Sequence, residues 1–159
     1  MKSSSMFRDA PALRDWPIVV LRVYTGIYFL YYGVGKLRRD NFADSVGNFV
    51  ISNLESCFGF FRPVMESVFL PNKAVFALLV AWGEFALGIA LIFGLMTRYA
   101  AIAGAFMVAI FWFAKGQGIL DSKNHDIIWL IILIVLAGLH AGRVMGLDQR
   151  LSQRFRFLA

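Results

Sequence analysis

Long apolar stretches, separated by shorter polar ones, set the pattern of this chain. Four helices are predicted at about residues 16–37, 74–95, 98–114 and 126–145, each with few charged positions. At a rise of ~1.5 Å per residue, the stretch 74–95 spans roughly 30 Å, which is the thickness of the hydrocarbon core of a bilayer. The pattern therefore predicts an all-α integral membrane four-helix bundle, in one domain over residues 1–159.

The connection between the first two predicted helices, residues 38–72, is not simply polar. An amphipathic helix is predicted over about residues 41–56 because apolar positions recur there at helical spacing. These positions are Phe42, Val46, Phe49, Val50 and Leu54. Residues 58–70 hold a second apolar group, and neither piece is long enough to span a bilayer. We expect both to lie in the membrane interface or to cap the bundle.

Composition agrees with a membrane protein. The chain is 59% hydrophobic, above the roughly 45–50% of soluble domains. The single cysteine, Cys57, excludes an internal disulfide and a CxxC redox pair. The net charge of +6 indicates membrane topology and anionic lipid headgroups, and no nucleic-acid-binding motif is present in the sequence.

Orientation follows from the charges near the ends of the predicted helices. Four spans place both termini on one side, together with the turn at residues 95–98. That side carries 8 Lys and Arg residues, against 7 on the opposite side. The positive-inside rule thus favours, by a narrow margin, cytoplasmic termini in the inner (plasma) membrane.

Three charged side chains are candidates for a catalytic centre. Glu84 is the only charge in the stretch 74–95, and a carboxylate at that depth costs at least ~2.5 kcal/mol on insertion scales. It therefore needs a partner, and Arg22 inside the first helix and Arg98 opening the third are the candidates. We expect these residues to form either a structural ion pair that holds the bundle or a polar pocket that binds a quinone headgroup or carries protons.

Lys36 and His140 are candidates for contact with a cofactor. Lys36 is placed as a lysine whose side chain extends from a helix end to the membrane interface. It also shares a helix face with Arg22 and Gly33, which keeps it a candidate for the site. His140 fits an interfacial or packed histidine, a hydrogen-bond donor to quinone, or an axial ligand of a porphyrin. Two histidines and one cysteine do not make a metal site, so no metal is expected. Two roles remain possible for the tyrosines of the first helix: an interfacial aromatic belt or stacking on a quinone ring. They are Tyr24, Tyr28, Tyr31 and Tyr32.

Short motifs follow one another along the chain in a fixed order. They are Arg22, Gly33-x-x-Lys36-Leu37, Glu84-x-x-x-Gly88, Gly94-Leu95-x-Thr97-Arg98 and Gly142-Arg143-x-x-Gly146-Leu147-Asp148. Their order and spacing over about residues 16–150 resemble the DoxX/DoxD family of small four-helix membrane proteins. Some members are membrane subunits of thiosulfate:quinone oxidoreductase, which passes electrons from thiosulfate to quinone. The resemblance implies a polar centre of Arg22, Lys36, Glu84 and Arg98, and it makes quinone the candidate cofactor.

Two functions remain open at this point. The first is the membrane subunit of a quinone-linked redox system, in which Glu84 or His140 exchanges protons and an arginine polarises a quinone oxygen or binds an anion. The second is a non-catalytic accessory subunit of a larger respiratory or photosynthetic membrane complex. Both imply contact with the lipid bilayer and with other membrane-protein subunits. A small transporter is disfavoured because the spans carry no inverted-repeat signal and no breaks.

Overall fold

The computed structural model describes residues 15–139 and 141–151. Helices make up this part of the chain, with no strand in the described residues, so the predicted all-α class is confirmed. The elements are α1 (Trp16–Leu37), α2 (Phe42–Asn53), α3 (Arg62–Val64), η2 (Met65–Phe69), α4 (Lys73–Phe93), α5 (Thr97–Lys115), α6 (His125–Gly138), η3 (Ala141–Arg143) and α7 (Leu147–Leu151).

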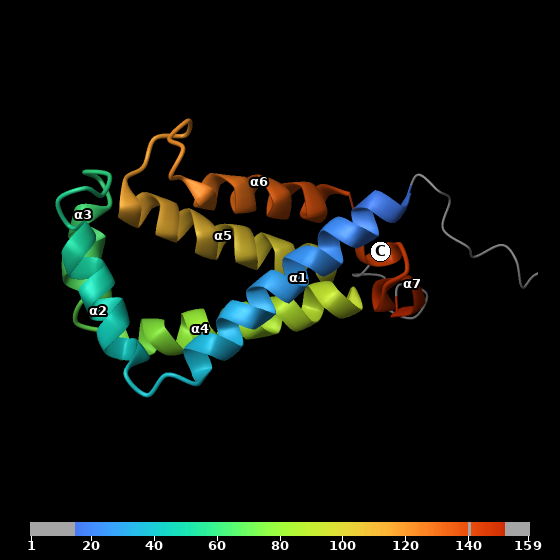
Figure 1. Cartoon of the computed structure of the whole chain (residues 1–159), viewed down its shortest axis with the longest axis horizontal. Helices are drawn as coiled ribbons and strands as arrows, with labels where there is room; N and C mark the ends of the chain where they lie inside the picture. The colour runs from blue at the N-terminus through green and yellow to red at the C-terminus, as the bar shows by residue number, and fades with distance from the viewer. Residues whose placement is uncertain (1–14, 140, 152–159) are drawn as a thin grey trace, which may run out of the picture.

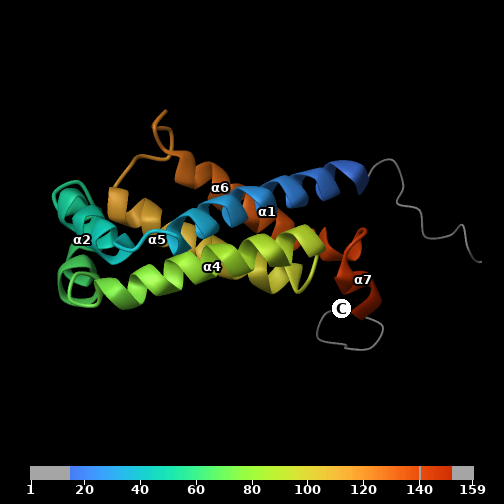
Figure 2. The ribbon, with the colours of Figure 1, turned by 60° about the horizontal axis from the view of Figure 1, so that its bottom comes forward.

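The long helices form two pairs. α1 packs along α4, and α5 packs along α6. α4 and α5 lie close together near their shared turn and diverge toward α2 (Figure 1). The segment of α2, α3 and η2 stands at that wide end, whereas α7 lies at the opposite end in both views (Figures 1 and 2).

Three helices, α1, α4 and α5, are long and apolar enough to cross a membrane. Large apolar side chains stay exposed on the outer faces of the helices, for example Val20 at 61%, Leu78 at 60% and Ile131 at 54%. Exposed apolar surface on this scale is costly in water, but it is the expected outer surface of a protein in lipid. The structure therefore agrees with the predicted membrane bundle.

The fourth predicted helix is shorter than expected. α6 has 14 residues and ends at Gly138, so the prediction of a helix up to residue 145 is wrong. Its length is roughly 21 Å at ~1.5 Å per residue, less than a bilayer core. A glycine at its end weakens the helix by ~1 kcal/mol relative to alanine. Beyond Gly138, the backbone carbonyls of Ala141, Val144 and Met145 accept hydrogen bonds from the Arg22 side chain.

Glycines set the contact between α1 and α4. A Cβ on Gly33 would lie 2.6 Å from the backbone nitrogen of Phe85, and one on Gly88 would lie 2.5 Å from that of Leu30. At Gly26 it would lie 2.8 Å from the nitrogen of Ile92. Small residues at a membrane helix interface let the backbones touch. The antiparallel register of α1 on α4 is therefore fixed by backbone contact.

The predicted amphipathic segment caps the wide end of the bundle. Val50 of α2, Phe61, Met65 and Ala114 of α5 form an apolar cluster there. The backbone nitrogen of Phe58 also donates to the carbonyl of Phe113 at 3.2 Å. A separate core joins the four long helices: Phe29, Leu87, Leu91, Ala101, Val108, Leu133, Leu136 and Ala141.

Candidate functional site

A buried ion pair joins α1 and α4. The Lys36 ammonium, in the last turn of α1, donates to Oε1 of Glu84 in the middle of α4. The side chains are 22% and 7% exposed, respectively. Gly33 brings them together, because its backbone lies against Glu84 and Phe85. The second carboxylate oxygen of Glu84, Oε2, is buried without a hydrogen-bond partner among the described residues.

Arg22 does not reach Glu84, and the expected pair between them is wrong. The guanidinium donates to the carbonyls of Ala141 at 2.5 Å, Val144 at 2.9 Å and Met145 at 3.4 Å. The register explains this position. With Gly33 against Glu84 and Phe85, Arg22 falls beside Gly94, roughly 15 Å farther along α4 at ~1.5 Å per residue.

The remaining candidate residues lie away from the Glu84 pair. Arg98 is exposed in the first turn of α5, four positions after Gly94, which lies beside Arg22. At that end Asp148 accepts hydrogen bonds from the backbone nitrogens of Met96 at 2.6 Å and Thr97 at 2.9 Å. A carboxylate on the first N–H groups of a helix satisfies donors that have no helical partner. The implied single polar centre is therefore split in two. His140 lies outside the described residues.

The Lys36–Glu84 pair lines a cavity of about 580 Å³. It lies between the two apolar clusters, since Phe29 and Val108 of one and Val50 and Ala114 of the other line it. α1, α2, η2, α4, α5 and α6 all contribute side chains to its wall. Pockets of about 300–1,000 Å³ with apolar walls and few polar groups are typical of small-molecule sites.

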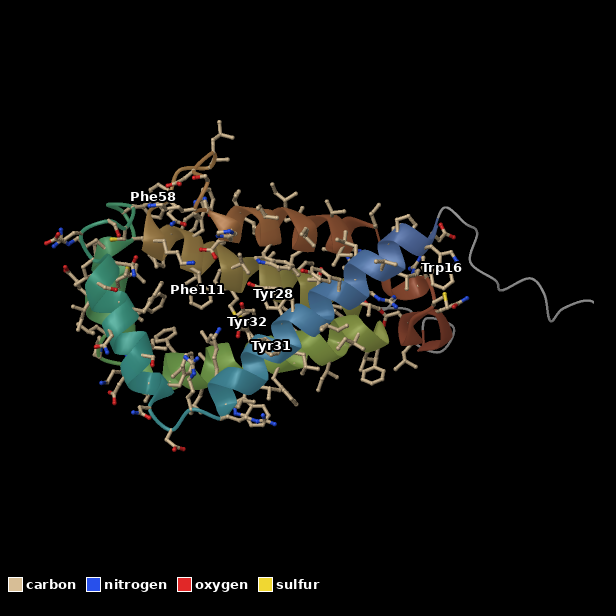
Figure 3. The ribbon with its side chains drawn as sticks, viewed as in Figure 1. Trp16, Tyr28, Tyr31, Tyr32, Phe58 and Phe111 are labelled. Atoms are coloured by element: carbon tan, nitrogen blue, oxygen red, sulfur yellow. The ribbon has the colours of Figure 1, made fainter. Side chains whose placement is uncertain are left out.

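Aromatic rings form much of the cavity wall. The ring of Tyr28 stacks on Trp129 with centroids 3.9 Å apart and lies 4.6 Å from that of Tyr32. The Lys36 ammonium is 5.8 Å from the ring centres of Phe42 and of Phe111, within the range of a cation–π contact. In Figure 3, Phe111 from α5 and Tyr28 and Tyr32 from α1 lie in the same central region.

The four tyrosines of α1 thus separate into two groups. Tyr28 and Tyr32 line the cavity. Tyr24 and Tyr31 are 60% and 74% exposed, as expected for rings that face lipid or the interface. Tyr32 is itself 46% exposed, and the division depends on how α1 packs against its neighbouring helices.

A second ion pair in the cavity wall was not anticipated. Lys115, the last residue of α5, lies with Nζ 2.7 Å from Oδ2 of Asp126 in the first turn of α6. Their side chains are 34% and 15% exposed. The sequence signal was a charged residue on each side of a polar loop. That pattern by itself indicates only charges at helix ends, where they interact favourably with the helix dipoles.

The fold and this site define an integral membrane helical bundle with an aromatic cavity around a buried ion pair. The sequence model of the DoxX family matches residues 18–116. The match covers more than half of the chain, and the protein belongs to the DoxX family. No curated protein and no solved structure gave a match. Lys36, Glu84 and Lys115 lie within the matched region, whereas Asp126 lies beyond it.

Proposed function

We propose that this DoxX-family protein is a membrane subunit of a quinone-linked redox system and that its cavity binds the quinone ring. The observation that carries the proposal is the cavity of about 580 Å³ with Tyr28, Trp129 and Phe111 in its wall. Flat aromatic walls suit a flat ring, since aromatic groups attract one another in stacked or edge-on arrangements.

The polar groups of the cavity also suit a quinone. An ammonium such as that of Lys36 donates hydrogen bonds to a ring carbonyl, and a carboxylate such as that of Glu84 accepts them from a ring hydroxyl. Oε2 of Glu84 is buried and unpartnered among the described residues, and a buried polar atom without a partner is costly. A hydroxyl of a reduced quinone ring would satisfy it once the Glu84 side chain turns Oε2 toward the cavity.

The position of the cavity mouth supports a lipid-soluble ligand. Leu79 of α4 and Phe106 of α5 line the cavity, yet they are 60% and 70% exposed. Exposed side chains of α4 and α5 thus form part of the cavity wall, on a surface that lipid covers in a membrane. A quinone with an isoprenoid tail would enter from the bilayer without crossing water.

The roles of the residues follow from these contacts. Lys36 and Glu84 bind and orient the oxygens of the ring, while the aromatic wall excludes water from it. Bound quinone supplies an acceptor for two electrons and two protons. A reduced substrate or a partner protein would supply the electrons, and Glu84 is the group placed to hold or release a proton at its Oε2.

The test is purification of the native protein in mild detergent, followed by mass spectrometry of the bound small molecules. We expect bound quinone in the native protein and at least a tenfold lower content in Glu84→Gln, which loses the carboxylate charge. Asp44→Asn is the control, because Asp44 is exposed and lies outside the cavity. Native protein without quinone that also fails to bind added quinone would refute the proposal.

A non-catalytic accessory subunit of a larger respiratory or photosynthetic complex is the second candidate. The short helix α6 favours it, because its 14 residues are fewer than the ~20 that cross a bilayer. A short hydrophobic segment is accommodated by membrane thinning or by association with other chains. Co-purification with a large electron-transfer complex, without quinone bound to this chain, would support that function.

We further propose that the protein lies in the plasma membrane with its termini in the cytoplasm. Lys and Arg residues are in slight excess on the terminal side, as the positive-inside rule requires. Glu55 is exposed just after α2, and α2 lies at the end of the bundle opposite α7 (Figure 1). In cells producing Glu55→Cys with Cys57→Ser, a membrane-impermeant maleimide should label the protein before lysis. Labelling only after lysis would show that the termini face the outside of the cell, which contradicts the proposed orientation.

A further inference from the structure

We propose that the Lys115–Asp126 pair is a second polar anchor of the same cavity, so that the ligand is a ring with oxygens at two opposite edges. This inference rests on the proposed function, because it specifies the chemistry of the molecule that the cavity binds. A para-quinone and its hydroquinone have this form. A phenol, with one oxygen, does not.

Both ion pairs lie in the wall of one cavity. Lys36, Glu84, Lys115 and Asp126 all line it. They come from different helices: the first pair joins α1 to α4, and the second joins α5 to α6. Since α1 packs on α4 and α5 on α6, each helix pair contributes one ammonium and one carboxylate to the space between them.

Helical spacing relates the two anchors to the aromatic wall. Phe111 and Lys115 are four positions apart on α5, and Asp126 and Trp129 are three apart on α6, so each pair shares a helix face. The Lys36 ammonium is 5.8 Å from the ring of Phe111, and Lys115 follows one turn later. The two anchors therefore lie at different heights along the cavity wall. A ring with oxygens at two opposite edges can form hydrogen bonds of about 2.8 Å at both ends.

Helix-end charges alone do not account for the position of the second pair. A lysine at the end of α5 and an aspartate at the start of α6 stabilise the two helix dipoles wherever they point. These side chains instead lie against a largely apolar cavity, and that of Asp126 is only 15% exposed. Lys115 is 34% exposed, but removing the Asp126 carboxylate from water costs free energy that one lysine repays only in part. A ligand that uses both groups explains why they lie there.

The experiment compares two ligands that differ by one oxygen. Binding of an alkylated hydroquinone and of the phenol with the same tail is measured under anaerobic conditions, with the full chain in nanodiscs. The native protein should bind the hydroquinone at least tenfold more tightly than the phenol. The double variant Lys115→Met/Asp126→Leu removes the pair without leaving a buried charge, and it should bind the two ligands with affinities within about twofold of each other.

A matched pair outside the cavity is the control. Lys73 and Asp44 also form an ammonium–carboxylate pair at 2.7 Å, but neither lines the cavity. Lys73→Met/Asp44→Leu should keep the tenfold preference. Thermal unfolding is followed in parallel, because a purely structural pair would change stability and leave the preference intact. If the apolar variant does not fold, Lys115→Gln/Asp126→Asn is used, and it should lower the preference several-fold.

The outcomes separate this inference from the proposed function. If the native protein binds neither ligand, the proposed function fails and this inference fails with it. If the native protein binds the hydroquinone and the variant keeps the tenfold preference, the second anchor alone is refuted. Loss of the preference in the cavity variant, but not in the control variant, is the result that supports it.

Discussion

Gly33→Ala is expected to lower the free energy of unfolding by about 2–3 kcal/mol, in the range of overpacked cores. The added methyl group would lie 2.6 Å from the backbone nitrogen of Phe85 and 3.0 Å from the carbonyl carbon of Glu84. Backbone atoms cannot turn aside as the end of a side chain can, so α1 and α4 must separate. Unfolding by a denaturing detergent, followed by circular dichroism, measures the change.

Gly35→Ala is the matched control, two positions farther along the same helix. No atom lies within 4 Å of a Cβ built there, and alanine is the better helix former by ~1 kcal/mol. This variant should be as stable as the native protein or slightly more stable. Equal stability of the two variants would contradict the close backbone contact between α1 and α4. Because Gly33 lies against Glu84, its variant should also weaken quinone binding.

Lys36→Met is expected to destabilise the protein by about 3 kcal/mol, the lower end of the range for breaking a buried pair. It leaves the Glu84 carboxylate, with a side chain only 7% exposed, without its cation. Glu84→Gln should cost only about 1 kcal/mol, because the Lys36 side chain is 22% exposed and can reach the interface with its charge.

The double variant Lys36→Met/Glu84→Gln completes a thermodynamic cycle. It should recover most of the stability that Lys36→Met loses, since no unpaired charge remains. Lys73→Met, which breaks an exposed pair, should cost less than about 1 kcal/mol and serves as the control. Strictly additive effects of the two cavity substitutions would show that the ammonium and the carboxylate do not interact in the folded protein.

The candidate site was only partly predictable from the sequence. Glu84 was identified because a single charge in an apolar helix needs a partner, and Lys36 because it shares a helix face with Arg22. The partner of Glu84 was assigned wrongly. Arg22 and Lys36 lie on the same face of α1, 14 positions apart, and the sequence contains no information about how far α1 slides along α4.

Residues outside the long apolar pattern were harder to predict. Phe111 and Trp129 lie in apolar helices, and Lys115 and Asp126 lie at helix ends, so no local pattern identified them as site residues. Their place in the cavity wall depends on the divergence of α4 from α5 and on the cap formed by α2 and η2. Beyond the end of α6 at Gly138, Arg22 of α1 binds three backbone carbonyls, a long-range contact that no local pattern shows.

The sequence by itself determined the all-α membrane class, three of the spanning helices and the face on which Arg22, Gly33 and Lys36 lie. These features follow from local periodicity and from the cost of burying charge in lipid, which act within a single helix. Only the tertiary structure decided that Lys36 meets Glu84 and that a second ion pair shares their cavity. The physical reason is that backbone contact at Gly33 and Gly88 sets the helix register, and register is a property of two helices together.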